Sequence, residues 1–279
     1  MKKWNVACLL AAILVLFSGC IQLNFNENGP LFPPIENPII PMQTTGQNAV
    51  IQTQSTQAPT VAAPVGNDGA ANWSKAEILS FFNNAVNRAK TADTYTLTRT
   101  LTHSIGLTQI NNESMREMAN GLTERMNRQQ ELQYSVQNTT ATDANGNAFY
   151  TNDLIMPTGR ACALTDADVL AARASFDGEN VIIVLSVADC EASLAAPVPN
   201  SGISPYLPMD NLSSDPFTVS DARILYSKRT VAAGINNAGR LVTVTATANA
   251  AVSTQCGIGV MTAQADYAGT LKEVIKLVY

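Results

Sequence analysis

Charged residues are scarce in this chain, and basic residues are fewer than acidic ones. They make up 14% of the 279 positions, whereas ordinary soluble domains have roughly 25%. The 17 Lys and Arg against 22 Asp and Glu give a net charge of −5, so nonspecific binding of nucleic acid is excluded. Thr (27) and Asn (25) supply the polarity instead, which favours strands and turns over exposed helices.

Histidine occurs only once, at His103, which excludes a metal site built from several histidines. The Gly-x-Ser-x-Gly, P-loop, dinucleotide-binding and His-Glu-x-x-His motifs are all missing. A serine triad would depend on His103 alone, and a lone His in a Thr-rich strand is typically a structural residue. No metal and no cofactor are therefore expected, and a non-enzymatic function is favoured.

The N-terminus has the pattern of an export signal. Lys2 and Lys3 precede an apolar run from Val6 to Phe17 that is too short to span a bilayer comfortably. This pattern predicts a signal peptide over residues 1–19.

The signal ends in small residues before a cysteine, in the sequence Leu16-Phe17-Ser18-Gly19-Cys20. This segment resembles the bacterial lipobox, although Phe17 stands where Leu is usual; the alternative is an ordinary signal peptide with an incidental cysteine. The resemblance implies cleavage before Cys20 and acylation of its sulfur, as in palmitate-bearing lipoproteins. It predicts a lipid-anchored, extracytoplasmic protein of the bacterial cell membrane or outer membrane, with a mature net charge of −7 once Lys2 and Lys3 are removed.

A linker follows the anchor. Residues 21–74 contain no Lys or Arg and only three acids, and Pro, Gln, Thr, Ala and Asn dominate. Such a segment buries too little apolar area to offset its ordering entropy. We therefore predict a disordered tether over residues 20–72, with a reach on the order of 40 Å, and a single domain over residues 73–279. An apolar patch at 31–40 offers a contact to lipid or to the domain.

The domain is predicted to begin with a helix. Ser74 and Glu77 have the spacing of a capping box, and Trp73 and Ile78 have that of a hydrophobic staple. Apolar residues recur at helical spacing over positions 78, 81, 82, 85, 86 and 89. One face of this helix is therefore expected to be buried, with Phe81 or Phe82 deep in the core.

A strand and a second helix are predicted next. Alternation over residues 94–103 places five side chains on one face of the strand: Tyr95, Leu97, Arg99, Leu101 and His103. Residues 113–130 have the spacing of a helix, with Met115, Met118, Leu122 and Met126 on one side.

Two hairpins and a final strand determine the predicted fold. The first hairpin joins residues 169–176 and 181–187, the second joins 222–233 and 241–252, and the last strand covers 265–279. Residues 189–220, with five prolines, form a long loop. The expected class is α+β: a curved antiparallel sheet packed on one or two helices. This element order is similar to that of the half-barrel lipoprotein carriers of bacterial envelopes.

Cysteines and carboxylates are the remaining candidates for chemistry. An exported location permits a disulfide, and Cys162 with Cys190 is the best pair, although buried reduced thiols, including Cys256, are an equal alternative. Asp143 to Asn147 resembles the start of a calcium loop, but Leu154 stands where the last ligand should be, so a polar turn is favoured.

Two functions follow from these observations. The first is a surface-anchored lipoprotein whose ectodomain binds a ligand or an envelope partner, such as a lipid or a glycan, without catalysis. The alternative is a cell-envelope hydrolase that uses carboxylates of the 166–191 region: Asp166, Asp168, Asp177 and Glu179.

Overall fold

A computed structural model of the protein describes residues 72–196, 202–207, 212–213 and 217–279. All of them belong to one unit of the chain. The predicted signal peptide, Cys20 and the tether up to residue 71 lie outside the described residues.

Helices form a small part of the described chain. They are α2 (Lys75–Thr91), the 3-10 helix η1 (Glu113–Met115), α3 (Arg116–Met126) and α4 (Thr151–Leu154). The strands are β1 (Thr94–Ile110), β2 (Arg128–Gln137), β3 (Thr140–Asp143), β4 (Ala148–Tyr150), β5 (Val169–Asp177), β6 (Asn180–Val187), β7 (Cys190–Ser193), β8 (Phe217–Ile235), β9 (Leu241–Ile258) and β10 (Met261–Val278).

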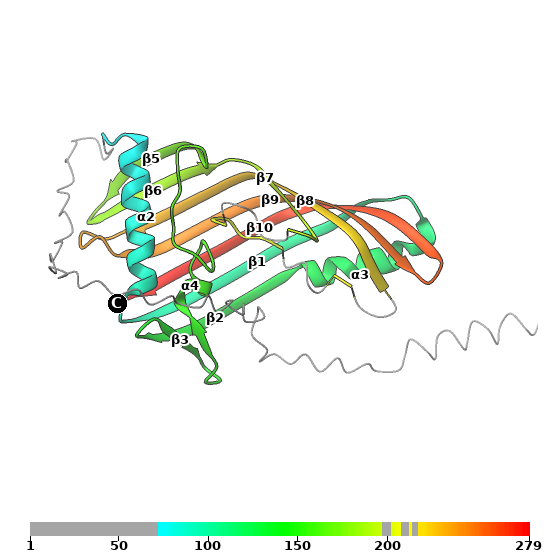
Figure 1. The fold of residues 1–279 in the computed structure, drawn as a ribbon, viewed down its shortest axis with the longest axis horizontal. Coiled ribbons are helices and arrows are strands. Elements are labelled where there is room, and N and C mark those ends of the chain that lie inside the picture. Colours follow the sequence, from blue (N-terminus) through cyan, green and yellow to red (C-terminus); the bar gives the residue numbers. More distant parts are fainter. Residues whose placement is uncertain (1–71, 197–201, 208–211, 214–216) are drawn as a thin grey trace, which may run out of the picture. The chain divides into compact units, whose positions relative to one another are not determined.

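The described strands form one ten-stranded antiparallel sheet in the order β4-β3-β2-β1-β10-β9-β8-β6-β5. The tenth strand, β7, pairs with residues 223–226 of β8, whereas β6 pairs with residues 229–235. The order has two ends, so the sheet is open, and it is curved, with α2 lying across the strands (Figure 1). The protein is thus mostly antiparallel sheet with few helices, which confirms the coarse fold prediction.

Residues alternate between buried and more exposed along the long central strands. The five side chains predicted to share one face of β1 are all buried. We call this face of the sheet the inner face.

Two apolar clusters of buried residues line the inner face. The α2 cluster joins α2 to the strand ends beside it and includes Phe82, Leu97, Ile183, Val231 and Ile275. The α3 cluster joins α3 to the other ends of the strands and includes Ile105, Leu122, Tyr226, Val252 and Leu271. Burial of these side chains is the main favourable term in folding.

Helix α2 begins as predicted, with Ser74 as N-cap and a complete capping box with Glu77. Phe82 is completely buried, whereas Phe81 is half-buried and its ring lies 5.0 Å from that of Trp73. The prediction that one of the two phenylalanines lies deep in the core is therefore confirmed.

Two asparagines on α2 bind the backbone of residues 162–164 with paired hydrogen bonds, as the edge of a neighbouring strand would do. The amide of Asn87 accepts from the backbone N–H of Cys162 at 2.7 Å and donates to the Cys162 carbonyl at 2.8 Å. Asn83 makes the same pair with the backbone of Leu164, at 3.1 and 2.9 Å. These four bonds satisfy backbone groups of a segment that has no strand partner of its own.

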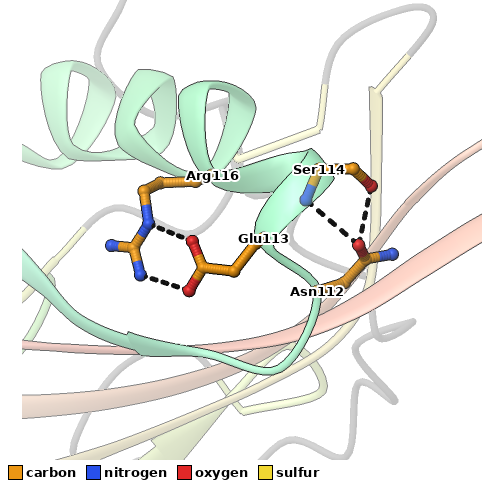
Figure 2. Close-up of polar contacts among 4 residues, drawn as sticks. All are labelled: Asn112, Glu113, Ser114 and Arg116. Atoms are coloured by element: carbon orange, nitrogen blue, oxygen red, sulfur yellow. Dashed lines mark hydrogen bonds and ion pairs between the residues drawn. The ribbon is translucent and has the colours of Figure 1, made fainter.

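The second helix starts with local side-chain contacts and ends earlier than predicted. Figure 2 shows that the side-chain amide oxygen of Asn112 accepts from the N–H and the hydroxyl of Ser114, and that Arg116 donates twice to the Glu113 carboxylate. Helix α3 ends at Met126, so the predicted span of 113–130 was wrong at its C-terminal end. Asn127 takes an extended conformation, and the chain turns directly into β2.

The predicted hairpins are confirmed as β5–β6 and β8–β9, with longer strands in the second. Strands β2, β3 and β4 were missed, and β7 and the start of β8 lie inside the predicted 189–220 loop. The β2 sequence has few apolar residues because it lies near the edge of the sheet, where a strand needs little apolar surface.

Candidate functional site

Polar side chains occupy the middle of the inner face, between the two apolar clusters. We call Arg99, His103, Arg128, Tyr206 and Glu273 the polar cluster. Alternation along β1 directs Arg99 and His103 to the inner face. The register places Glu273 of β10 opposite Leu101, and Arg128 of β2 opposite His103. Charged groups are rarely buried unless they are paired or hydrogen-bonded.

Arg99 and Glu273 form a buried ion pair. The Nε of Arg99 lies 2.6 Å from an oxygen of Glu273, and their side chains are 6% and 3% exposed. Burial opposes the charge on Arg99, but the Glu273 carboxylate and the nearby Tyr206 and Tyr134 hydroxyls outweigh it and raise the pKa of Arg99. Arg99 therefore keeps its positive charge. The terminal nitrogens of Arg99 make no further hydrogen bond to the described residues.

His103 is buried without a hydrogen-bond partner. It is only 5% exposed, and neither ring nitrogen makes a hydrogen bond within the described residues. Burial, followed by the positive charges of Arg128 and Arg99, lowers the pKa of His103 to about 4, although the Met126 backbone, which faces the ring without reaching hydrogen-bond geometry, acts in the opposite direction. The imidazole is thus neutral at pH 7 and has one donor and one acceptor nitrogen to offer. A buried polar group left unsatisfied costs about 1–3 kcal/mol.

Arg128 is half-buried and makes no hydrogen bond or ion pair with the described residues. Burial and then the guanidinium of Arg99 lower the pKa of Arg128, whereas the Tyr206 hydroxyl partly compensates. The polar cluster therefore holds two guanidinium groups and one carboxylate, for a net charge of about +1 at neutral pH. The whole chain, in contrast, is acidic.

Asn127 and Gly269 fix the backbone beside His103. The amide of Asn127 accepts from the Ile105 N–H at 2.5 Å and donates to the Ile105 carbonyl at 3.1 Å, so it continues the β1–β2 pairing. On the other side, a Cβ on Gly269 would lie 1.9 Å from the Ser104 carbonyl oxygen, so only glycine allows this approach of β1 and β10. The position of His103 is thus set by the strands on both sides of β1.

Residues 202–207 connect the two apolar clusters of the inner face. Ile203 belongs to the α2 cluster and Leu207 to the α3 cluster. The hydroxyl of the fully buried Ser204 accepts from Arg229 Nε at 2.9 Å, and the Leu207 N–H donates to the Tyr226 hydroxyl at 3.0 Å. Between these anchors, Tyr206 is close enough to Arg99 and Arg128 to affect the pKa of both.

The carboxylates considered for hydrolysis do not form one group. Asp166 pairs with Lys75 at 2.8 Å, and Asp168 accepts from the N–H and hydroxyl of Thr165, both at 2.8 Å. Asp177 and Glu179 lie at the β5–β6 turn, at the other end of the hairpin. Nine residues of extended strand separate these two pairs by about 30 Å.

The three cysteines of the described residues, Cys162, Cys190 and Cys256, are unpaired, and the disulfide stays a prediction. Cys162 is buried beside Asn83 of α2, whereas Cys190 lies opposite Tyr226 in the β7–β8 register. Burial raises the pKa of the Cys162 thiol to about 12, although the Leu164 N–H acts against it. It is therefore a thiol rather than a nucleophilic thiolate at neutral pH.

The predicted polar turn at residues 143–147 is held together by hydrogen bonds among its own residues. The Asp143 carboxylate accepts from the backbone N–H groups of Asn145 and Asn147 and from the Asn147 amide. No group of three or more His, Cys, Asp or Glu residues able to hold a metal occurs within the described residues.

Two surface hollows occur in the described part of the chain; the walls of the first are mostly polar, and those of the second are about half apolar. One, of about 360 Å³, lies at β8, β9 and β10 and is lined by residues such as Asp221, Arg223 and Gln255. The other, of about 420 Å³, lies at the C-terminal ends of α2 and β10 and is lined by Arg88, Arg240 and other residues. Neither is an apolar cavity between α2 and the sheet.

Sequence reasoning placed Arg99 and His103 on one face but did not link them to Arg128 or Glu273. The signal for Glu273 is present: a lone acid stands at an inward position between Leu271 and Ile275. For Arg128 there was no signal, because the span 113–130 was interpreted as one helix.

None of the helices in the described part of the chain is long and apolar enough to cross a bilayer. No protein-family model matches the chain, and no curated protein or solved structure is significantly similar to it.

Proposed function

We propose that the protein is a lipid-anchored, extracytoplasmic lipoprotein of a bacterial envelope and that its domain binds an amphiphilic ligand without catalysis. In this proposal Cys20 holds the lipid, residues 20–72 are the tether, and residues 73–279 form the binding domain. The curved sheet with its helices acts as a half-barrel whose inner face receives the ligand.

The observation that carries the proposal is His103 in the middle of the inner face, whose ring nitrogens have no hydrogen-bond partner among the described residues. Folding alone would favour an apolar residue here, because an apolar side chain of similar volume leaves no hydrogen-bonding group unsatisfied. A polar group that lowers stability is commonly retained for binding. Apolar clusters flank the polar cluster on both sides, so a ligand with a polar headgroup and an apolar body fits the position best.

The described contacts favour binding over hydrolysis. The lone histidine is buried and neutral, with no acid or hydroxyl hydrogen-bonded to it, so a Ser-His pair is not formed within the described residues. The candidate carboxylates Asp166 and Asp168 are engaged by Lys75 and Thr165. No specific observation favours the hydrolase.

Binding is tested with the chain from residue 20 carrying Cys20→Ala, which needs no detergent. The neutral dye N-phenyl-1-naphthylamine should bind saturably and should be displaced by amphiphiles with a single oleoyl chain. An absence of saturable dye binding and of any displacement would overturn the proposed ligand class.

Anchoring is tested separately with the full precursor in a bacterial host. Wild-type protein should incorporate labelled palmitate and sediment with membranes, whereas Cys20→Ala should lose the label. Equal labelling of both proteins would contradict the lipobox interpretation.

The tether is tested by deleting residues 28–69. A disordered segment contributes no burial, so the thermal midpoint of the domain should change by less than about 5 °C. A larger decrease would mean that this segment packs on the domain.

A further inference from the structure

We infer that the ligand carries an anionic headgroup, a carboxylate or a phosphate, and that Arg99, Arg128 and His103 bind it. This inference rests on the proposed function and names the chemistry of the same site.

The charge balance of the polar cluster is the first argument. Glu273 neutralises Arg99, but the charge of Arg128 has no carboxylate partner among the described residues. No acidic side chain is among the groups that perturb the pKa of Arg128 or of His103. The chain as a whole is acidic, yet the half-buried guanidinium of Arg128 lies beside a second guanidinium without a carboxylate partner among the described residues. This local excess of positive charge would stabilise a bound anion.

The free hydrogen-bond donors are the second argument. Within the described residues Arg99 bonds only through its Nε, to Glu273, so its terminal nitrogens are available to a ligand, and Arg128 has no described partner for any of its donors. His103 adds one ring N–H. Two guanidinium groups and an imidazole are the donor set that carboxylate and phosphate oxygens prefer, because charge-assisted bonds are the strongest.

These three residues lie within mutual electrostatic reach. Arg128 and His103 are directly opposite in the β1–β2 register, and the guanidinium of Arg99 lowers the pKa of both. Tyr206 also affects the pKa of both guanidinium groups.

The side of the sheet at β2 provides the approach to the polar cluster. Arg128 and Leu132 are half-buried and Gln130 is exposed, and these residues alternate on the face of β2 that carries the buried Tyr134. A headgroup that arrives from this side meets Arg128 first. Leu132, which packs against the α2 cluster, then provides apolar surface for the rest of the ligand.

The test compares three ligands with the same oleoyl chain: oleate, 1-oleoyl lysophosphatidate and 1-monooleoylglycerol. Each displaces N-phenyl-1-naphthylamine from the Cys20→Ala chain that begins at residue 20. At least one anionic ligand should bind about tenfold or more tightly than the neutral glyceride, which is about 1.4 kcal/mol. Preference for oleate or for lysophosphatidate identifies the headgroup as carboxylate or phosphate.

Arg128→Gln should weaken the anionic ligand by about tenfold and leave the glyceride unchanged. Lys272→Gln is the matched control, because Lys272 is exposed on the outer face of β10 and its loss changes the net charge equally. Equal weakening by both variants would mean nonspecific charge attraction and would overturn the inference.

The outcomes separate the two proposals. If all three ligands bind equally, the anionic headgroup is wrong and the proposed amphiphile binding stands. If none binds, the proposed function itself fails. If Arg128→Gln does not fold, as judged by circular dichroism, the comparison of the three ligands on the wild-type site still tests whether the headgroup is anionic.

Discussion

Arg99 on β1 and Glu273 on β10 form a 2.6 Å ion pair in which less than a tenth of either side chain is exposed. The two residues are not opposite each other in the register; the pair is diagonal, since Glu273 faces Leu101. Desolvation of both charges costs free energy that their attraction only partly returns, so the pair is a weak argument for stability. Its position between two apolar clusters is better explained by a role in orienting Arg99.

Removing one partner of this ion pair should lower the free energy of unfolding strongly, whereas replacing both partners with apolar residues should lower it much less. Glu273→Ala leaves the Arg99 charge buried and unpaired, and we expect a loss of about 3–5 kcal/mol in the free energy of unfolding by urea. The double variant Arg99→Met, Glu273→Leu should be clearly more stable than Glu273→Ala. A double variant that is as unstable as the single one would contradict this account.

The two adjacent phenylalanines of α2 offer a direct test of its buried face. Phe82→Ala should cost about 3–5 kcal/mol because the side chain is fully buried. Phe81→Ala should cost clearly less, since Phe81 is only half-buried, against Trp73 and the edge of the α2 cluster. Urea unfolding of the two variants measures the difference, and equal losses would refute the assignment of faces.

The asparagine contacts of α2 are tested with a neighbouring residue as control. Asn87→Ala removes two hydrogen bonds to the backbone of Cys162 and should destabilise the domain by about 1–3 kcal/mol. Asn84→Ala should be nearly neutral, because Asn84 is exposed on the same helix. A neutral Asn87→Ala would show that the segment at Cys162 does not depend on the helix.

The pH dependence of stability should include a contribution from His103. Its pKa is lowered from 6.5 to about 4 in the folded protein. Between these values the unfolded chain binds a proton that the folded chain does not, so stability falls as the pH decreases from about 6.5 towards 4. Above pH 6.5 this contribution is constant.

His103→Leu should remove that part of the pH dependence. At pH 7 the variant should be as stable as the wild type or more stable, because a buried unsatisfied group is replaced by an apolar one. Urea unfolding at pH 7, 6 and 5 measures both effects. An unchanged slope, or a loss of more than about 2 kcal/mol at pH 7, would mean that His103 is a structural residue.

The elements with strong local signals could be predicted from the sequence. The capping box of Ser74 and Glu77 and the turn at 177–180 depend on neighbouring residues, and the structure has both. The end of α3 depends instead on a tertiary contact, because the Asn127 amide is used by Ile105 on β1. Helical spacing of methionines before Asn127 gives no sign of this contact.

Only part of the candidate site could be predicted from the sequence, because the rest of it also depends on tertiary contacts. Alternation placed Arg99 and His103 on one face, which the structure confirms. Arg99 and Glu273 are 174 residues apart, and only the β1–β10 pairing brings them together. A single sequence contains the alternation of each strand but not the order of the strands in the sheet.

The central claim, that the polar cluster is a ligand site, is tested most directly by the resonance of the only histidine. Nitrogen-15 NMR of the imidazole in the Cys20→Ala chain should give one signal set, for a neutral ring that titrates near pH 4. Saturating 1-oleoyl lysophosphatidate or oleate should shift the ring nitrogens and raise the pKa of His103, since a neighbouring anion favours the imidazolium. A spectrum and pKa that stay unchanged while an anionic amphiphile is bound would contradict the account.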